Sequence, residues 1–185
     1  MNFYTQYSDT LTEQLNTFDW SLVEHLVEAV MTVWQNEQRL FICGNGGSAG
    51  NAVHLANDFI YGVNPSGRAI DAEALSANSA VLTCLGNDLG YEHIFSHQVS
   101  VKAKPGDLLI VLSGSGNSAN IVRALAQAKS QGVKTCAILG YSGGEAKALA
   151  DLPIHFSVND MQISEDLQLI VGHMLMRRLN TLITS

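Results

Sequence analysis

Proline, basic residues and long hydrophobic runs are scarce in this sequence of 185 residues, and each shortage excludes a class of protein. With 3 prolines and 16 glycines beside 46% hydrophobic residues, the composition is neither collagen-like nor disordered. Lysine and arginine number 10 against 17 acidic residues, which gives a net charge of −7. Because no basic cluster offsets this charge, we expect no general affinity for nucleic acid or for an anionic membrane. Any anionic ligand must then be bound by a local site.

Cysteine is also rare, with Cys43, Cys84 and Cys136 as the three examples. They form no CxxC pair, so the sequence offers neither a disulfide framework nor a cysteine zinc site, and we predict all three to be buried core thiols. The longest apolar runs, such as residues 108–112, are far shorter than the ~18 residues that cross a bilayer. The first residues lack the basic start and apolar stretch of a secretion signal. We therefore expect a cytoplasmic location and no membrane partner.

The order of apolar segments predicts a single α/β domain over residues 1–185, close to the typical domain length of ~150 residues. After a helical first third, short apolar runs alternate with helical patterns. This alternation is typical of a doubly wound parallel sheet, which binds ligands at the carboxyl ends of its strands. The predicted strands are residues 40–43, 69–74, 107–112, 134–139 and 154–158. The predicted helices that accompany them are residues 49–61, 80–87, 92–102, 120–131, 144–150 and 163–183.

The two terminal helical regions indicate self-association. In the N-terminal segment, residues 1–36, apolar residues recur at helical spacing from Leu22 to Trp34 before the sheet begins, so their stripe needs a surface to cover it. The last predicted helix carries more apolar positions, from Leu167 to Leu182, than one sheet face needs. We therefore predict a homo-oligomer built from these helices, with residues 37–185 as the ligand-binding core.

A glycine-rich loop at residues 44–50 follows the first predicted strand and opens a helix. Gly46 and Gly47 leave backbone N–H groups accessible, and the positive end of the helix dipole favours an anion there. The loop lacks the spacing of a dinucleotide fingerprint and the GK[ST] of a nucleotide P-loop, so it fits a smaller phosphate ester better. Taken alone, it also fits a tight strand-to-helix turn.

A second loop of similar chemistry, SGSGNS at residues 113–118, follows the third predicted strand. Serine hydroxyls donate to phosphate oxygens without adding charge, which suits a site for a dianion in an acidic protein. Two such loops on neighbouring strands are hard to explain by turn formation alone. A third segment, residues 141–144, is interpreted as a turn and the start of a helix. We predict that four serines act with backbone N–H groups of the first loop. The predicted contact residues of the phosphate site are Asn45, Gly46, Gly47, Ser48, Ser113, Gly114, Ser115 and Ser118.

The loops CGNGGSA at residues 43–49 and SGSGNS, with the segment 82–88 between them, resemble the SIS (sugar isomerase) family over residues 41–179. More narrowly, the chain resembles the phosphoheptose isomerases. The resemblance implies a five-stranded parallel sheet of flavodoxin-like type, an N-terminal helical extension and a homotetramer with active sites between subunits. It also implies an aldose–ketose isomerase that converts sedoheptulose 7-phosphate to D-glycero-D-manno-heptose 7-phosphate through an enediol, for lipopolysaccharide or related surface glycans.

His54 and Asp58 lie four residues apart on the helix that leaves the first loop, so both side chains project from one face near the predicted phosphate site. Aldose–ketose isomerisation moves a proton between C1 and C2, and it needs an acid/base group and an electrophile for the oxyanion. In the isomerases that the chain resembles, the matching helix carries a His and a Glu as zinc ligands, and the Glu is also the acid/base group. Here Asp58 is shorter by one methylene group, a change that matters for proton transfer.

The last predicted helix carries Glu165 and His173. A histidine in an apolar pattern is often a satisfied core residue, but the resemblance places a metal-binding, catalytic His at position 173 and a ligating Gln at position 165. It thus implies one zinc ion per subunit, held by His54, Asp58, Glu165 and His173, with Asp58 and His173 as the catalytic pair. Because eight helical residues span ~12 Å, Glu165 and His173 can scarcely bind one ion together, and we leave open that they serve sites in different subunits.

Further residues match the family less completely. Asn87 and Asp88 match a pair that contacts the sugar, and we expect Asp58 and Glu165 to contact substrate as well. Residues 61–63 lack an Arg that the family carries there. His93 and His97 have the spacing of a metal pair, but with no carboxylate beyond Glu92 beside them an exposed or interface face is favoured.

Two other functions stay open at this point. Some SIS relatives act as regulatory partners, including one that promotes assembly of the bacterial replication initiator, but the joint presence of His54, Asp58, Glu165 and His173 favours an enzyme. The same scaffold could also isomerise another sugar phosphate, because the sequence does not reveal the contacts that measure substrate length.

Overall fold

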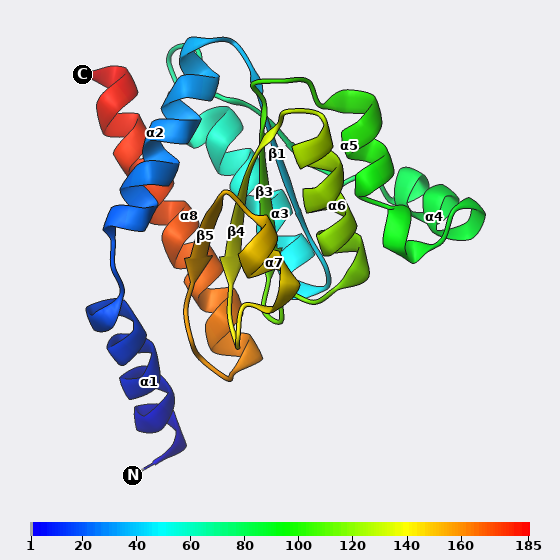
Figure 1. Ribbon diagram of the computed structural model, residues 1–185. Helices are drawn as coiled ribbons and strands as arrows, with labels where there is room; N and C mark the ends of the chain where they lie inside the picture. The colour runs from blue at the N-terminus through cyan, green and yellow to red at the C-terminus, as the bar shows by residue number, and fades with distance from the viewer. Residues whose placement is uncertain (1) are drawn as a thin grey trace.

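The computed structural model describes residues 2–185 as a five-stranded parallel sheet between two layers of helices (Figure 1). The strands follow the order β2-β1-β3-β4-β5, and every neighbouring pair is parallel. This is the flavodoxin-like order, in which the winding direction changes between β1 and β3. The predicted fold class is confirmed. The strands are β1 (Arg39–Gly44), β2 (Asp71–Ala74), β3 (Leu108–Ser113), β4 (Lys134–Leu139) and β5 (Leu152–His155).

Alternate residues of each strand face opposite helical layers. Leu40 and Ile42 of β1 pack with one layer, and Phe41 and Cys43 pack with the other. The first layer consists of α2 (Ser21–Gln35), α3 (Gly47–Asn57) and α8 (Met161–Thr184). The second layer consists of α5 (Ser96–Lys102), α6 (Ala119–Ser130) and α7 (Gly144–Leu149). Both sheet faces are therefore buried, and the carboxyl edge of the strands is left for a ligand.

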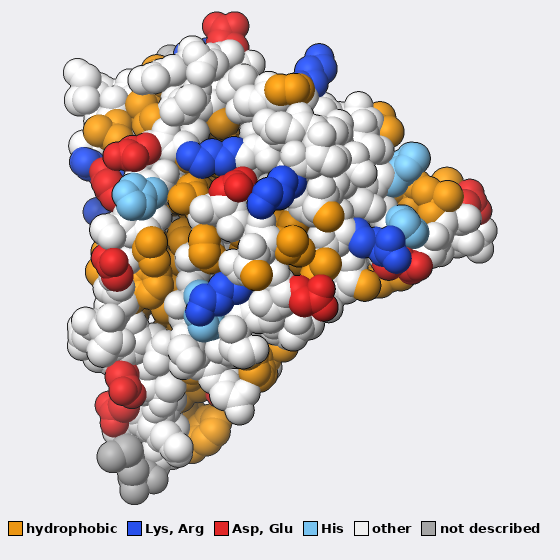
Figure 2. Space-filling model, viewed as in Figure 1, with side chains coloured by type: hydrophobic (Ala, Val, Ile, Leu, Met, Phe, Trp, Pro, Cys, Tyr) orange, Lys and Arg blue, Asp and Glu red, His pale blue; other side chains and the backbone are white. Residues whose placement is uncertain are grey.

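Two helices lie outside these layers (Figure 1). Helix α1 (Phe3–Thr17) has no buried residue and extends away from the sheet at the lower left of the view. It is held partly by the Tyr7 hydroxyl, which donates to Oδ2 of Asp166 at 2.5 Å, and this bond raises the pKa of Tyr7 to about 12. Helix α4 (Ser79–Asp88) projects at the opposite side and buries Leu85 alone. Figure 2 shows hydrophobic side chains gathered beside the point where α1 joins α2, and over α4.

Most predicted elements are present, and the bounds of three differ most clearly from the prediction. The last strand is Leu152–His155 rather than residues 154–158, because its ladder with β4 ends at the pair Leu139 and His155. Beyond the ladder, two single backbone hydrogen bonds continue the contact, from the Phe156 N–H to Leu139 and from the Tyr141 N–H to Val158. The predicted helix 92–102 is divided into a 3₁₀ turn, Tyr91–His93, and α5. The predicted helix 49–61 is divided as well: α3 ends at Asn57, and a π-helical segment, Asp58–Gly62, follows it.

The cysteines divide into two environments. Cys43 and Cys136 are fully buried as predicted, and burial raises the pKa of both thiols. Cys84 is exposed, so the prediction of a core thiol is wrong there. The reason is its position on the outer surface of the projecting helix α4, where a hydrogen bond to Asp88 raises the pKa of the Cys84 thiol. Over residues 2–185, no helix combines the length and the apolar character needed to span a membrane.

Candidate active site

The two glycine and serine loops converge on one pocket at the carboxyl ends of β1 and β3. Because these strands are neighbours and the winding direction changes between them, both loops open onto the same crevice. The pocket has a volume of about 250 Å³ and includes all eight residues of the predicted phosphate site. Its lining consists of Asn45, Gly46, Gly47, Ser48, Leu112, Ser113, Gly114, Ser115, Ser118, Met161 and Glu165.

Two helix N-termini point at this pocket without side-chain caps. Helix α3 follows Gly46 and α6 follows Ser118, and neither residue caps its helix through a side chain. The first N–H groups of an α-helix have no partner within the helix, so they are free to bind an anion. The hydroxyl of Ser118 is likewise available to a ligand. The pocket therefore combines two positive helix ends with hydroxyl donors.

Backbone conformation fixes the shape of both loops. Gly46 has a φ of +55°, a conformation that side chains rarely adopt. Gly116 has a φ of +68°, and a Cβ atom there would lie 2.0 Å from the carbonyl oxygen of Gly143. Within the second loop, Oγ of Ser113 accepts a hydrogen bond from the Gly116 N–H at 3.0 Å, which leaves the hydroxyl proton of Ser113 free to donate. Both loops are thus rigid turns with donors on their inner side.

Glu165 supplies a carboxylate to the pocket lining. A Cβ atom on Gly47 would lie 2.3 Å from Oε2 of Glu165, so the glycine leaves the space that this side chain occupies. The backbone carbonyl of Glu165 accepts from Nδ2 of Asn51 at 3.0 Å, which ties α8 to α3 near the pocket. An acid beside the predicted phosphate position opposes the two positive helix ends.

A second group of polar side chains lies further along α3 and α8. Nε2 of His54 and Nε2 of His173 are 2.9 Å apart, and Oδ2 of Asp58 lies 3.5 Å from the first and 3.6 Å from the second. Both imidazoles are about half exposed, whereas the Asp58 side chain is only 17% exposed. We call these three residues the His/Asp cluster. It brings together both members of the predicted catalytic pair.

Close packing of α3 on α8 makes this cluster possible. A Cβ atom on Gly172 would lie 2.2 Å from Cδ2 of Leu55, so the helices approach more closely here than a side chain would allow. His173 follows Gly172 directly and is thereby brought to His54. Asp58 begins the π-helical segment, which widens the turn after α3. Such segments often occur at functional positions.

The donor set of the His/Asp cluster fits a zinc ion. Two imidazole nitrogens and a carboxylate oxygen are ligands that zinc prefers, at distances of about 2.0–2.2 Å. A triangle with the three observed sides has a circumradius of about 1.9 Å, so a single point can lie at ligand distance from all three atoms. Catalytic zinc sites commonly have three protein ligands and an open fourth position. The cluster could therefore hold the metal without a fourth residue from the same chain.

Three of the predicted site residues lie apart from this cluster. Glu165 is not part of the cluster, and it lies at the pocket between the two loops, two helical turns earlier on α8. Asn87 and Asp88 are exposed on the projecting α4, where Nδ2 of Asn87 donates to Oδ1 of Asp88 at 2.7 Å. Neither contributes to the pocket lining. His93 lies 4.0 Å from the carboxylate of Glu92, and among the described residues no metal-binding group includes it.

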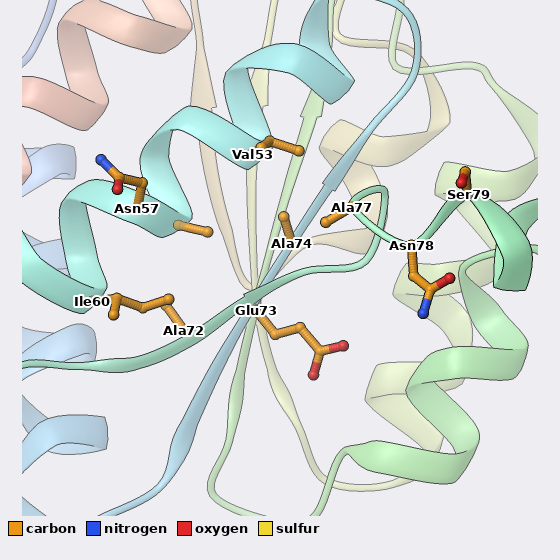
Figure 3. Close-up of a pocket in the computed structure, with 10 residues that line it drawn as sticks. Val53, Asn57, Ile60, Ala72, Glu73, Ala74, Ala77, Asn78 and Ser79 are labelled. Atoms are coloured by element: carbon orange, nitrogen blue, oxygen red, sulfur yellow. The ribbon is translucent and has the colours of Figure 1, made fainter.

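A larger cavity of about 590 Å³ lies on the outer side of α3, against the edge strand β2 (Figure 3). Val53 and Ile60 line it together with alanines of β2. Its one carboxylate, Glu73, is paired with Arg39 and Lys102 and is turned away from Val53 and Ile60 in Figure 3. The cavity lacks convergent groups for acid/base chemistry, so the smaller pocket is the better candidate for the active site.

Sequence reasoning missed a buried residue beside the pocket. Asn120, in the first turn of α6, is 1% exposed and exchanges two hydrogen bonds with Asn45. The only local signal was an Asn two positions after Ser118, the residue that precedes α6. Such a spacing does not reveal a partner that lies 75 residues away.

Comparison with known proteins agrees with this architecture. A family model described as SIS domain matches residues 3–140, which includes the N-terminal helices that lie outside the resemblance at 41–179. The phosphoheptose isomerase of Clostridium acetobutylicum is 38% identical over 151 residues, which cover 82% of this chain and 77% of that protein. The resemblance to phosphoheptose isomerases thus extends over most of both chains.

Solved structures give the same result for the fold. The phosphoheptose isomerase of Neisseria gonorrhoeae matches with a TM-score of 0.88 and 26% identity, covering 96% of this chain and 95% of that one. The phosphoheptose isomerase of Francisella tularensis matches with a TM-score of 0.91 over 97% and 95% of the two chains, and at 23% identity it supports the fold alone. From its sequence and its fold together, the chain belongs to the SIS-domain family and, within it, to the phosphoheptose isomerases.

Proposed function

We propose that this protein is an aldose–ketose isomerase that converts sedoheptulose 7-phosphate to D-glycero-D-manno-heptose 7-phosphate for surface-glycan synthesis. The observation that carries the proposal is the presence of two separate polar centres on the same pair of helices. The pocket at the start of α3 offers donors for a phosphate, and the His/Asp cluster offers groups for proton transfer. The names of the curated relatives support the same reaction.

The separation of the two centres suits a seven-carbon substrate. His54 follows Gly47 by seven residues on α3, and His173 follows Glu165 by eight on α8, so the cluster lies roughly 10–12 Å from the pocket along the helices. An extended heptose is roughly 10 Å long from C1 to phosphorus, with carbon–carbon bonds of about 1.5 Å, and a pentose phosphate is roughly 7–8 Å long. A heptose phosphate held at the pocket would thus bring C1 and C2 to the cluster.

The cluster residues divide the proton transfers between them. Asp58 takes the proton from one of the two carbons and returns it to the other, because one carboxylate can act first as a base and then as an acid. His173 moves the proton between the sugar oxygens through Nδ1, the ring nitrogen that is not part of the cluster. A zinc ion bound by His54, Asp58 and His173 would polarise the sugar carbonyl oxygen and stabilise the negative charge that develops on it.

The exposed helices favour a homo-oligomer, and the resemblance to the family predicts a tetramer. Phe3 and Tyr4 on α1 are 73% and 79% exposed, and Met174 on α8 is 44% exposed beside the cluster. Burial of these apolar side chains against other copies would stabilise an oligomer. Asn87, Asp88 and Glu165, which lie apart from the cluster of their own chain, would then be able to reach the site of a neighbour. Sedimentation at micromolar concentration should give the mass of four chains, and a stable monomer would contradict this assembly.

The direct test follows the reaction itself. The zinc-loaded protein is incubated with sedoheptulose 7-phosphate, and the aldose is measured. Fructose 6-phosphate and ribulose 5-phosphate serve as shorter substrates. We expect turnover of the heptulose with at least about a tenfold higher kcat/KM than for either shorter sugar, since a misplaced reacting carbon lowers the rate steeply. Equal turnover of all three would contradict the length argument, and no turnover with zinc bound would favour a regulatory protein.

A further inference from the structure

We propose that Asn120 and Tyr91 are positioning residues that hold the two loops of the phosphate pocket at a fixed separation through Asn45. The proposal rests on the phosphate-binding role proposed above for this pocket. Neither residue lines the pocket, and both act through a residue that does. We call the three residues the loop clamp.

The core of the loop clamp is a reciprocal amide pair. Nδ2 of Asn45 donates to Oδ1 of Asn120, and Nδ2 of Asn120 donates to Oδ1 of Asn45, both at 2.8 Å. Asn45 stands in the loop after β1, whereas Asn120 lies in the first turn of α6, after β3. The pair therefore joins the two strand-to-helix connections that form the pocket. Among the side-chain hydrogen bonds of the described residues, these two are the ones that join the loops directly.

Because Asn120 is buried, loss of this pair of hydrogen bonds would be costly. Asn120 is 1% exposed, so its amide has no access to water as an alternative partner. A residue without both a donor and an acceptor at position 120 would leave the Asn45 amide partly unsatisfied, and the first loop would lose its tie to α6. Asn45 directly precedes Gly46, whose φ of +55° sets the direction of the following N–H groups. Loss of this pair of hydrogen bonds would thus change the direction of the N–H groups that are proposed to bind the anion.

Tyr91, an exposed residue that belongs to neither loop, is the third member of the loop clamp. Its hydroxyl donates to Oδ1 of Asn45 at 2.9 Å, although the side chain is 61% exposed. Tyr91 opens the 3₁₀ turn that follows α4, the helix that carries Asn87 and Asp88. The hydroxyl therefore connects the projecting helix to the phosphate pocket. An exposed tyrosine that directs its hydroxyl to a pocket residue is better explained by positioning than by core packing.

The test measures the binding of inorganic phosphate by calorimetry, together with KM and kcat for sedoheptulose 7-phosphate and the melting temperature. Asn120→Ala removes the reciprocal pair without adding charge, and Tyr91→Phe removes one hydroxyl. Gln98→Ala is the matched control, because Gln98 is also buried and its Nε2 donates to the carbonyls of Leu75 and Ile94, away from the pocket.

We expect Asn120→Ala to weaken phosphate binding by about tenfold or more and Tyr91→Phe by about two- to fivefold, from the usual effect of losing such hydrogen bonds. KM should rise by similar factors while kcat changes less. Gln98→Ala should lower the melting temperature but leave the phosphate Kd within about twofold, since no hydrogen bond near the pocket is lost.

Unchanged phosphate affinity in folded Asn120→Ala would overturn the proposal, as would an equal loss of affinity in Gln98→Ala. If Asn120→Ala does not fold, Tyr91→Phe decides the matter, and wild-type affinity in that variant would overturn the proposal. A wild-type protein that binds phosphate but does not isomerise the heptulose would refute the proposed function alone, because the loop clamp is measured on phosphate binding.

Discussion

The phosphate pocket and the His/Asp cluster lie on the same two helices but are built in different ways. The pocket uses backbone N–H groups and serine hydroxyls on loops that directly follow β1 and β3. The cluster uses side chains from helix faces, and its two histidines are 119 residues apart in the chain. In the proposed function, binding at the pocket is therefore spread over many weak donors, whereas chemistry at the cluster depends on three atoms and on the packing that brings them together.

Substitutions in the cluster should separate chemistry from binding most clearly. We expect Asp58→Asn and His173→Gln to lower kcat by about 10²–10⁴, the usual contribution of an acid/base group, while the Kd for inorganic phosphate stays at the wild-type value. Asp58→Asn should keep more of its zinc than His173→Gln, because Asn places an oxygen where the carboxylate oxygen lies, whereas Gln replaces an imidazole nitrogen, a preferred zinc ligand, with a weaker amide donor. Steady-state kinetics, calorimetry and elemental analysis measure these effects. A large rise in the phosphate Kd would show that the two centres are not independent.

Metal removal tests the same separation without a substitution. Exhaustive chelation should abolish turnover, and added zinc should restore it, because the carbonyl oxygen loses a Lewis acid worth several kcal/mol. Phosphate binding to the chelated protein should be unchanged. Elemental analysis of the untreated protein should find about one zinc ion per chain. Full activity with no metal detected would leave Asp58 and His173 as a metal-free acid/base pair.

Loss of one hydroxyl from the pocket should have a moderate effect. Ser115→Ala is expected to weaken sugar-phosphate binding by ~1–3 kcal/mol, because one donor to the phosphate is lost. Its zinc content and melting temperature should match those of the wild type. Ser142→Ala, on the exposed neighbouring loop, is the control and should leave calorimetric affinity unchanged. Wild-type affinity in Ser115→Ala would remove the second loop from the site.

Glu165→Gln should give the smallest change and the opposite sign. Removing the carboxylate from the pocket lining removes repulsion toward a phosphate dianion, and two unit charges about 4 Å apart repel by about 1 kcal/mol when water screens them fully. We therefore expect phosphate to bind several-fold more tightly, with unchanged zinc content. Asp166→Asn, at the adjacent position but bonded to Tyr7, is the control. Loss of zinc in Glu165→Gln would instead show that this residue reaches the cluster of another subunit.

The same contrast explains what the sequence could predict. The pocket follows from local patterns, because a glycine-rich turn after a buried strand fixes both its conformation and its place at the sheet edge. The resemblance to a known family directed attention to His173, which helical spacing alone would have left as a core residue. Asn120 was missed, since its partner is brought near only by the parallel pairing of β1 and β3. Cys84 was misplaced, because an apolar pattern on a short helix does not reveal that the helix projects from the core.

Gly172 binds no ligand, but it sets the distances between the donor atoms of the His/Asp cluster. Its missing side chain allows α8 to approach Leu55, and the three donor atoms consequently lie within 3.6 Å of one another. A methyl group at this position would move His173 away from α3 and enlarge the triangle. Donors further apart would no longer all lie at the ligand distance of a single zinc ion, about 2.0–2.2 Å. The fit of the cluster to a zinc ion thus depends on the helix interface, one residue before His173 itself.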